Sequence, residues 1–74
     1  MENKLKRLLS VVLDVDEEMI NEKASADSIE GWDSLKQMNI IVAIEEEFGI
    51  LFDEDEAILS NSFSSLNELI KAKQ

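Results

Sequence analysis

The chain has no cysteine, histidine, tyrosine or proline, and only two glycines among its 74 residues. Without cysteine it can form neither a disulfide framework nor a thiolate metal site, which suits a reducing compartment. Without proline, and with 45% hydrophobic residues, the sequence favours a fold made mostly of helix. Because a histidine, a thiol and a glycine-rich phosphate loop are all missing, we expect a protein that is not an enzyme and that holds no metal.

Basic residues are also scarce, since seven lysines and arginines accompany seventeen aspartates and glutamates, for a net charge of −10. The imbalance is concentrated in residues 24–70, where eleven acidic residues stand beside a single base, Lys36. Such a field repels nucleic acid and anionic membranes and attracts basic protein surfaces. An acidic surface can also serve solubility alone, so composition leaves both explanations open.

No apolar run approaches the ~20 residues that a membrane span requires. The run at residues 8–13 is shorter and belongs to an amphipathic pattern, so we expect neither a secretory signal nor membrane insertion. We expect a cytoplasmic protein with one domain, residues 1–74, and we further expect it to be a monomer.

Helical periodicity accounts for most of the chain. It predicts long helices over residues 2–13 and from Asp33 or Ser34 to Phe48, and a last helix from Ser62 or Ser64 to about Ala72. A short helix should begin at Asp53, which has the spacing of a capping box with Glu56. The expected core faces consist of Leu5, Leu8, Leu9, Val12 and Leu13, then Ile40, Ile41, Ile44 and Phe48, and finally Leu66, Leu69 and Ile70.

A long connection, residues 14–30, separates the first two helices. Its expected inward anchors are Val15, Met19, Ile20 and Ile29. A connection of this length is uncommon in a compact domain unless it is functional. The predicted fold class is all-α, a four-helix bundle with a short third helix and a long loop between helices one and two.

Ser34 is the candidate functional residue, at the start of the second predicted helix. Asp33 can cap this helix, Gly31 lets the chain turn sharply before it, and the exposed amides of a helix start stabilise an anionic group. No histidine or thiol is present to activate the hydroxyl of Ser34. The arrangement points to a site that another enzyme modifies, although an Asp-Ser pair is also an ordinary helix cap.

The motif Gly31-Trp32-Asp33-Ser34-Leu35 resembles the phosphopantetheine attachment motif of acyl carrier proteins. The resemblance continues through residues 13–18, 45–50 and 52–56 and the last helix. It implies that a phosphopantetheinyl transferase attaches 4′-phosphopantetheine from coenzyme A to Ser34, with Asp33 and Leu35 in the attachment site. The resemblance also implies that the thiol of the arm holds an acyl group as a thioester, which such carriers can shelter between their helices.

Three successive carboxylates, residues 45–47, occupy the last turn of the second predicted helix. There they repel one another and oppose the helix dipole, at about 0.3–1 kcal/mol each when exposed. Stability does not favour this cluster, which supports a role in partner binding. In the family resembled, the helix after the serine is the recognition helix. The resemblance therefore implies docking by acyl-transferring and synthase enzymes with basic surfaces, through Leu35, Met38, Val42, Glu45 and Glu46.

The sequence departs from the pattern of housekeeping fatty-acid carriers. Lys36 and Asn39 stand where those carriers usually have acids, and Trp32, which we interpret as a partly buried lid of the loop, replaces a small residue. The motif looks more like discrete carriers of polyketide, nonribosomal or specialised lipid pathways. A peptidyl or aminoacyl carrier and an unmodified acidic interaction module remain alternatives. A calcium sensor is disfavoured, because residues 53–56 lack the alternating ligands and central glycine of an EF-hand loop.

Overall fold

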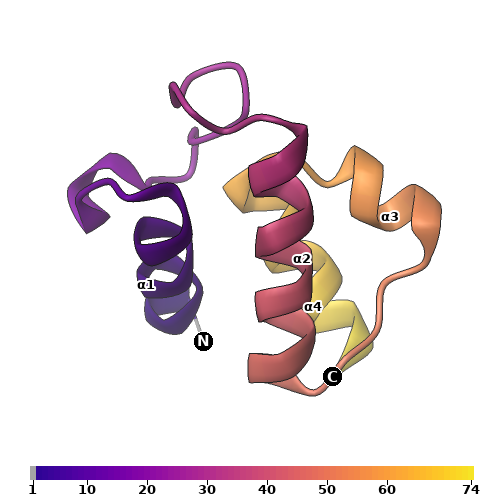
Figure 1. Ribbon diagram of the computed structural model, residues 1–74. Coiled ribbons are helices and arrows are strands. Elements are labelled where there is room, and N and C mark those ends of the chain that lie inside the picture. Colours follow the sequence, from indigo (N-terminus) through magenta and orange to yellow (C-terminus); the bar gives the residue numbers. More distant parts are fainter. Residues whose placement is uncertain (1) are drawn as a thin grey trace.

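The computed structural model describes residues 2–74, with side chains from residue 4 onward. Over this part of the chain it contains four α-helices and one 3-10 helix (Figure 1): α1 (Glu2–Leu13), η1 (Glu17–Met19), α2 (Ser34–Phe48), α3 (Glu54–Leu59) and α4 (Phe63–Lys73). The described residues form no strand, and a single isolated bridge joins Ser25 to Ser62. The predicted all-α fold with a short third helix is confirmed.

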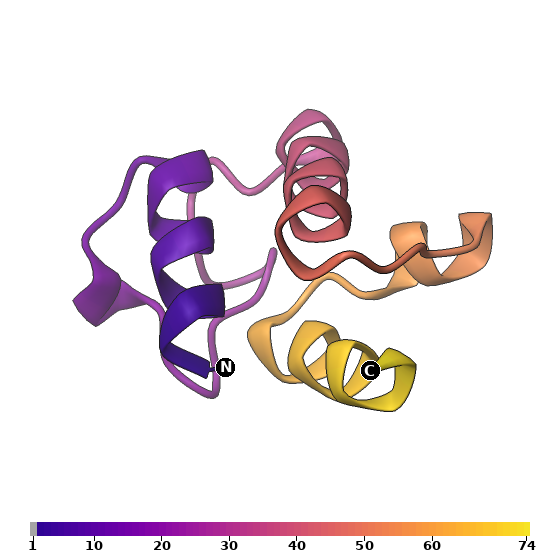
Figure 2. The same ribbon diagram turned by 90° about the horizontal axis from the view of Figure 1, so that it is seen from below.

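Helix α2 is central to the molecule. Figure 1 and Figure 2 show α1 along one side of it and α3 along the other, while α4 lies behind α2 in Figure 1 and contacts α1. The predicted core faces of α1 and α2 are confirmed, and Leu66 and Ile70 of α4 are buried as predicted. Leu69, also predicted to point inward, is half-buried and is not part of the buried cluster that these helices form. The fully buried side chains of this cluster include Leu5, Leu9, Ile40, Ile44, Leu66 and Ile70. Burying a side chain of this size stabilises the fold by about 1.5–3 kcal/mol.

The helix boundaries follow from short-range signals. Gly49 ends α2 in the left-handed conformation, at φ +67°, where a residue without a side chain is least strained. Asp53 and Glu56 form the predicted capping box of α3. Ser62 caps α4 by accepting the N–H of Ser65.

The connection between α1 and α2 contains η1 and a series of turns. Ile20 and Ile29 are buried as predicted, and Ala24 joins them, but Met19 is 55% exposed, so its prediction as an inward anchor is wrong. Met19 ends the 3-10 helix on its solvent side, and Ile20 takes the inward position. Two backbone hydrogen bonds of 2.9 Å, from Ala26 N–H to the Asn61 carbonyl and from Phe63 N–H to the Ala24 carbonyl, tie this connection to the segment between α3 and α4.

Candidate functional site

Ser34 is the first residue of α2, and its side chain is exposed. Asp33 precedes the helix in an extended conformation, and its Oδ1 accepts the N–H of Lys36 at 2.9 Å. The predicted N-cap is therefore confirmed. Gly31 has a φ of +93°, a conformation that residues with a side chain rarely adopt. Together, Gly31 and Asp33 turn the chain and present the Ser34 hydroxyl at the helix start.

Two backbone N–H groups remain available at this helix start. The N–H of Lys36 is occupied by the Asp33 carboxylate, and the N–H of Gln37 by the Asp33 carbonyl at 2.8 Å. The N–H groups of Ser34 and Leu35 have no partner among the described residues. Because such groups carry partial positive charge at a helix N-terminus, they favour an anion. The site fits a phosphodiester attached to the Ser34 oxygen.

The hydroxyl of Ser34 differs from those of most other serines in the chain. Six serines have their side-chain oxygens hydrogen-bonded within the fold: Ser10, Ser25, Ser28, Ser60, Ser62 and Ser65. Over the described residues, Ser34 and Ser64 have hydroxyls without such a partner. Ser64 is the second residue of α4 and is exposed, but neither an aspartate nor a glycine turn precedes it. Ser64 is thus a natural comparison for Ser34.

A surface pocket of about 400 Å³ opens beside Ser34. Its apolar walls come from Ala26, Trp32, Met38 and Ile58, and its polar ones from Asp27, Asp33, Gln37 and Asn61. None of the described residues that line it is a lysine or an arginine. A larger groove of about 640 Å³ lies between α1 and α2 and does not include Ser34. The smaller pocket is therefore the one that a group held on Ser34 meets first.

Two buried polar side chains support the turn before α2. Trp32 is 4% exposed, so it is more deeply buried than the predicted lid, and its Nε1–H donates to Oε1 of Gln37 at 2.7 Å. The Nε2 group of Gln37, itself 6% exposed, donates to the carbonyls of Ala57 and Ser60 at 2.9 Å each. Gln37 was not among the residues predicted from the sequence to belong to the site. Its helical spacing indicates burial, because Gln37 precedes Ile40, Ile41 and Ile44 by three, four and seven residues and so lies on the core face of α2.

The apolar residues predicted to meet partners lie together on the solvent side of α2. Leu35 is 69% exposed, Met38 47% and Val42 50%. Their helical spacing places them on one stripe, and Glu46 extends it by one further turn. Apolar residues gathered on an exposed face are typical of interaction sites.

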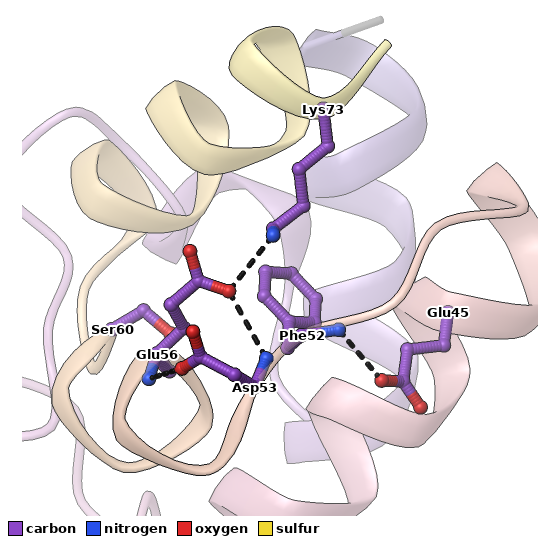
Figure 3. Close-up of polar contacts among 6 residues, drawn as sticks. All are labelled: Glu45, Phe52, Asp53, Glu56, Ser60 and Lys73. Carbon is purple, nitrogen blue, oxygen red and sulfur yellow. Dashed lines mark hydrogen bonds and ion pairs between the residues drawn. The ribbon is translucent and has the colours of Figure 1, made fainter.

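The three carboxylates at the end of α2 have different environments. Glu45 accepts the backbone N–H of Phe52 at 2.9 Å, as Figure 3 shows, and thereby fixes the turn after the helix. Glu47 lies 3.5 Å from Lys4, whose ammonium is also 5.0 Å from the ring centroid of Phe48. Glu46 is exposed and has no partner within the described part of the chain. The expectation that the cluster has no stabilising role is therefore corrected for Glu45 and Glu47.

The acidic segment before α3 is a capping structure. Asp53 and Glu56 exchange hydrogen bonds with each other's backbone N–H groups, and Lys73 of α4 lies 2.8 Å from Glu56 (Figure 3). The hydrogen bond from Lys73, together with that from the Asp53 N–H, lowers the pKa of Glu56 below its ordinary value of 4.5. In the described residues, no group of three or more acidic, histidine or cysteine side chains is arranged to hold a metal. None of the helices described has the length and apolar character needed to cross a membrane.

Comparison with protein families gives one match over almost the whole chain. The family model described as phosphopantetheine attachment site matches residues 3–72. The acyl carrier protein of Nitratidesulfovibrio vulgaris (strain DP4) is 39% identical over 57 residues, which are 77% of this chain and 75% of that protein. The acyl carrier protein of Buchnera aphidicola subsp. Acyrthosiphon pisum (strain Tuc7) is 33% identical over 73 residues, 99% of this chain and 91% of that protein.

A solved structure is similar over the same extent. The solution NMR structure of the holo acyl carrier protein from Geobacter metallireducens matches with a TM-score of 0.85 at 30% sequence identity. The match covers 97% of this chain and 83% of the other. Fold and sequence thus point to the same relatives.

Proposed function

The chain belongs to the acyl carrier protein family, and from this premise we propose that its 4′-phosphopantetheine is attached to Ser34, with Asp33 and Leu35 completing the attachment site. Residues 1–74 form a single carrier domain in this proposal. When bound, the group supplies a thiol that holds an acyl group as a thioester, a chemistry for which this chain has no cysteine of its own. Partner enzymes of fatty-acid, polyketide or specialised lipid biosynthesis receive what the carrier presents.

The observation that carries the assignment to Ser34 is its exposed, unbonded hydroxyl at the start of α2. Asp33 holds the first turn in place by accepting the N–H of Lys36. The N–H groups of Ser34 and Leu35 are then positioned to stabilise the negative charge of a phosphodiester. Each of the three residues therefore has a separate physical role in the attachment site.

We assign no catalytic step to the carrier itself. The Ser34 hydroxyl has no base as a hydrogen-bond partner in the described structure, and the whole sequence contains no histidine. The phosphopantetheinyl transferase therefore supplies the base and the magnesium, and Ser34 supplies the attacking oxygen. The carrier is a substrate of this reaction and afterwards a carrier, not an enzyme.

The docking surface for partners is the exposed stripe of α2. Leu35, Met38 and Val42 form its apolar centre, and Glu46 with Glu45 forms an acidic border. A partner with arginines and lysines around an apolar depression is complementary to this stripe, because opposite charges speed encounter and apolar burial slows release. We place the carrier in the cytoplasm, where coenzyme A is available, and expect it to act as a monomer.

Transfer of the arm tests the assignment. The wild-type chain is incubated with a promiscuous phosphopantetheinyl transferase and coenzyme A, and its intact mass is measured. We expect the mass of one arm to be added to the wild type and none to Ser34→Ala, with the helical circular dichroism unchanged.

Ser64→Ala is the matched control, because it removes the other exposed, unbonded hydroxyl near a helix start. This variant should accept one arm as the wild type does. Labelling of Ser34→Ala would remove Ser34 from the site, and a wild type that accepts no arm would favour the unmodified acidic interaction module.

A further inference from the structure

The interior behind the attachment site is closed by one polar side chain. Gln37 lies one turn after Ser34 and points into the space between α2 and α3, where it is 6% exposed. Its carboxamide is bonded on both sides, to the indole of Trp32 at 2.7 Å and to the carbonyls of Ala57 and Ser60 at 2.9 Å. The side chain thus joins the turn that carries Ser34 to the C-terminal end of α3.

This joint is built from buried groups. Trp32, Ala57 and Ser60 are all buried, as Gln37 itself is. A chain that passed between α2 and α3 at this end would displace the carboxamide and leave an indole N–H, an amide and two carbonyls without partners in the interior, which proteins avoid. Ile40 and Ile44, the next residues of α2 on this face, are fully buried, so the core behind Gln37 is packed.

The space that stays open is the pocket outside this joint. Its walls include the polar side chains of Asp27 and Asn61 and the outer side of Gln37, beside the apolar Met38 and Ile58. Such a mixed lining offers hydrogen bonds to the amide groups of the arm, and its apolar part is a surface patch of Ala26, Trp32, Met38 and Ile58 that lies outside the core.

We propose that Gln37 is a specificity-determining residue, which excludes the carried acyl group from the core and so suits this carrier to short, polar acyl groups. The proposal rests on the proposed function, because it concerns what is held on Ser34. It makes hydroxyacyl or aminoacyl groups better cargo than long alkyl chains, since a long chain left outside the core stays in contact with water.

A series of acyl chain lengths tests the proposal. Transferase and acetyl-, octanoyl- or dodecanoyl-coenzyme A load the wild type, and intact mass confirms each loading before any other measurement. Burial of an alkyl chain in so small a domain should raise the melting temperature by more than about 5 °C. We expect the three loaded wild-type forms to melt within about 2 °C of one another, with an unchanged emission maximum of Trp32.

Gln37→Met removes the polar joint but keeps a side chain of similar length. In this variant we expect the octanoyl form to melt well above the acetyl form and the emission of Trp32 to change between them. Asn39→Met is the matched control, because Asn39 is an exposed amide of the same helix, and it should behave as the wild type does.

Three outcomes overturn the proposal, and one concerns the carrier function alone. If the melting temperature of the wild type rises steeply with acyl chain length, the core is open to the chain. If the melting temperature is independent of chain length in both the wild type and a folded Gln37→Met, a group other than Gln37 closes the core. If Gln37→Met does not fold, Trp32→Phe takes its place, because it removes one of the three hydrogen bonds of Gln37. The melting temperature of Trp32→Phe must then depend more strongly on acyl chain length than that of the wild type. If it does not, the role of the joint is rejected. Failure of the wild type to accept any arm contradicts the attachment at Ser34 instead.

Discussion

At the scale of the residue, the site is defined by which polar groups are already bonded. Ser34 keeps its hydroxyl and its backbone N–H without partners in the described structure, whereas the carboxylate of the adjacent Asp33 is engaged with the first turn. Gln37, three residues further on, uses both ends of its amide. Within a single turn of helix, Ser34 thus offers a hydroxyl for modification, while the side chains of Asp33 and Gln37 hold the surrounding structure in place.

Removing the cap of α2 should destabilise the protein without changing its surface elsewhere. We expect Asp33→Ala to lower the free energy of unfolding by about 1 kcal/mol, because the N–H of Lys36 loses its acceptor. Urea unfolding followed by circular dichroism measures this. Asp27→Ala removes an exposed carboxylate near the same pocket that caps no helix, and an equal loss in that variant would argue against the capping explanation.

Glu56 should make the stability depend on pH. Its hydrogen bonds from Lys73 and from the Asp53 N–H hold its folded pKa below the ordinary 4.5. Because the folded pKa is lowered, Glu56 contributes stability above the ordinary pKa, and this contribution is lost as the pH falls through the folded value. The difference in unfolding free energy between wild type and Glu56→Gln should therefore shrink from about pH 6 to about pH 3. A difference that stays constant with pH contradicts a lowered pKa of Glu56 in the folded protein.

At the scale of the element, helix positions could be read from the sequence because the signals are local. Asp33, the pair Asp53 and Glu56, and Gly49 act within one turn of their own helix. The periodic apolar residues of α1, α2 and α4 likewise identify the faces that must be buried. The start of α2 at Ser34, and with it the position of the candidate site, follows from these signals.

The features that could not be read from the sequence depend on contacts between distant segments. Gln37 meets Ala57 and Ser60 across 20 and 23 residues, and its periodic position indicates burial but not its partners. Glu45 finds Phe52 only once α2 has ended and the chain has turned. Met19 was assigned inward for its hydrophobicity, whereas the 3-10 helix leaves it on the surface. Spacing along the chain contains no information on these choices.

Charged and apolar residues of the docking stripe on α2 should affect different rate constants of partner binding. Glu46→Lys is expected to slow association with the transferase and to flatten its dependence on salt, because exposed charges act mainly on encounter. Val42→Asp should instead raise the dissociation rate, because it buries an unpaired charge in the contact. Surface plasmon resonance at two salt concentrations measures both rates.

Glu45 requires a different substitution, because its carboxylate also holds the N–H of Phe52. Glu45→Gln keeps an oxygen acceptor and removes the charge, so it should slow association with little loss of stability. Glu45→Lys should both slow association and lower the stability of the fold. Unchanged rates in Glu46→Lys and Val42→Asp would place the docking surface elsewhere than on α2.

At the scale of the whole molecule, charge opposes compaction. The net charge is −10, and in the described residues two ion pairs are formed, Lys4 with Glu47 and Lys73 with Glu56. Both join neighbouring parts of the bundle at its periphery, and most other acidic side chains are exposed. Repulsion among these carboxylates therefore acts on a small core with a limited reserve of stability.

Sodium chloride should raise the melting temperature of this protein at pH 7, because at about 0.15 M it screens charges more than about 8 Å apart. The two short ion pairs are screened less than the repulsion between more distant carboxylates. Added salt should therefore weaken mainly the repulsion and stabilise the fold. A variant that combines Glu46→Gln with Asp27→Asn removes two exposed charges that have no ion-pair partner in the described structure, changing the net charge from −10 to −8. This variant should melt higher than the wild type at low salt and gain less from added salt. A melting temperature that falls as sodium chloride is added would show that the attractive pairs outweigh the repulsion.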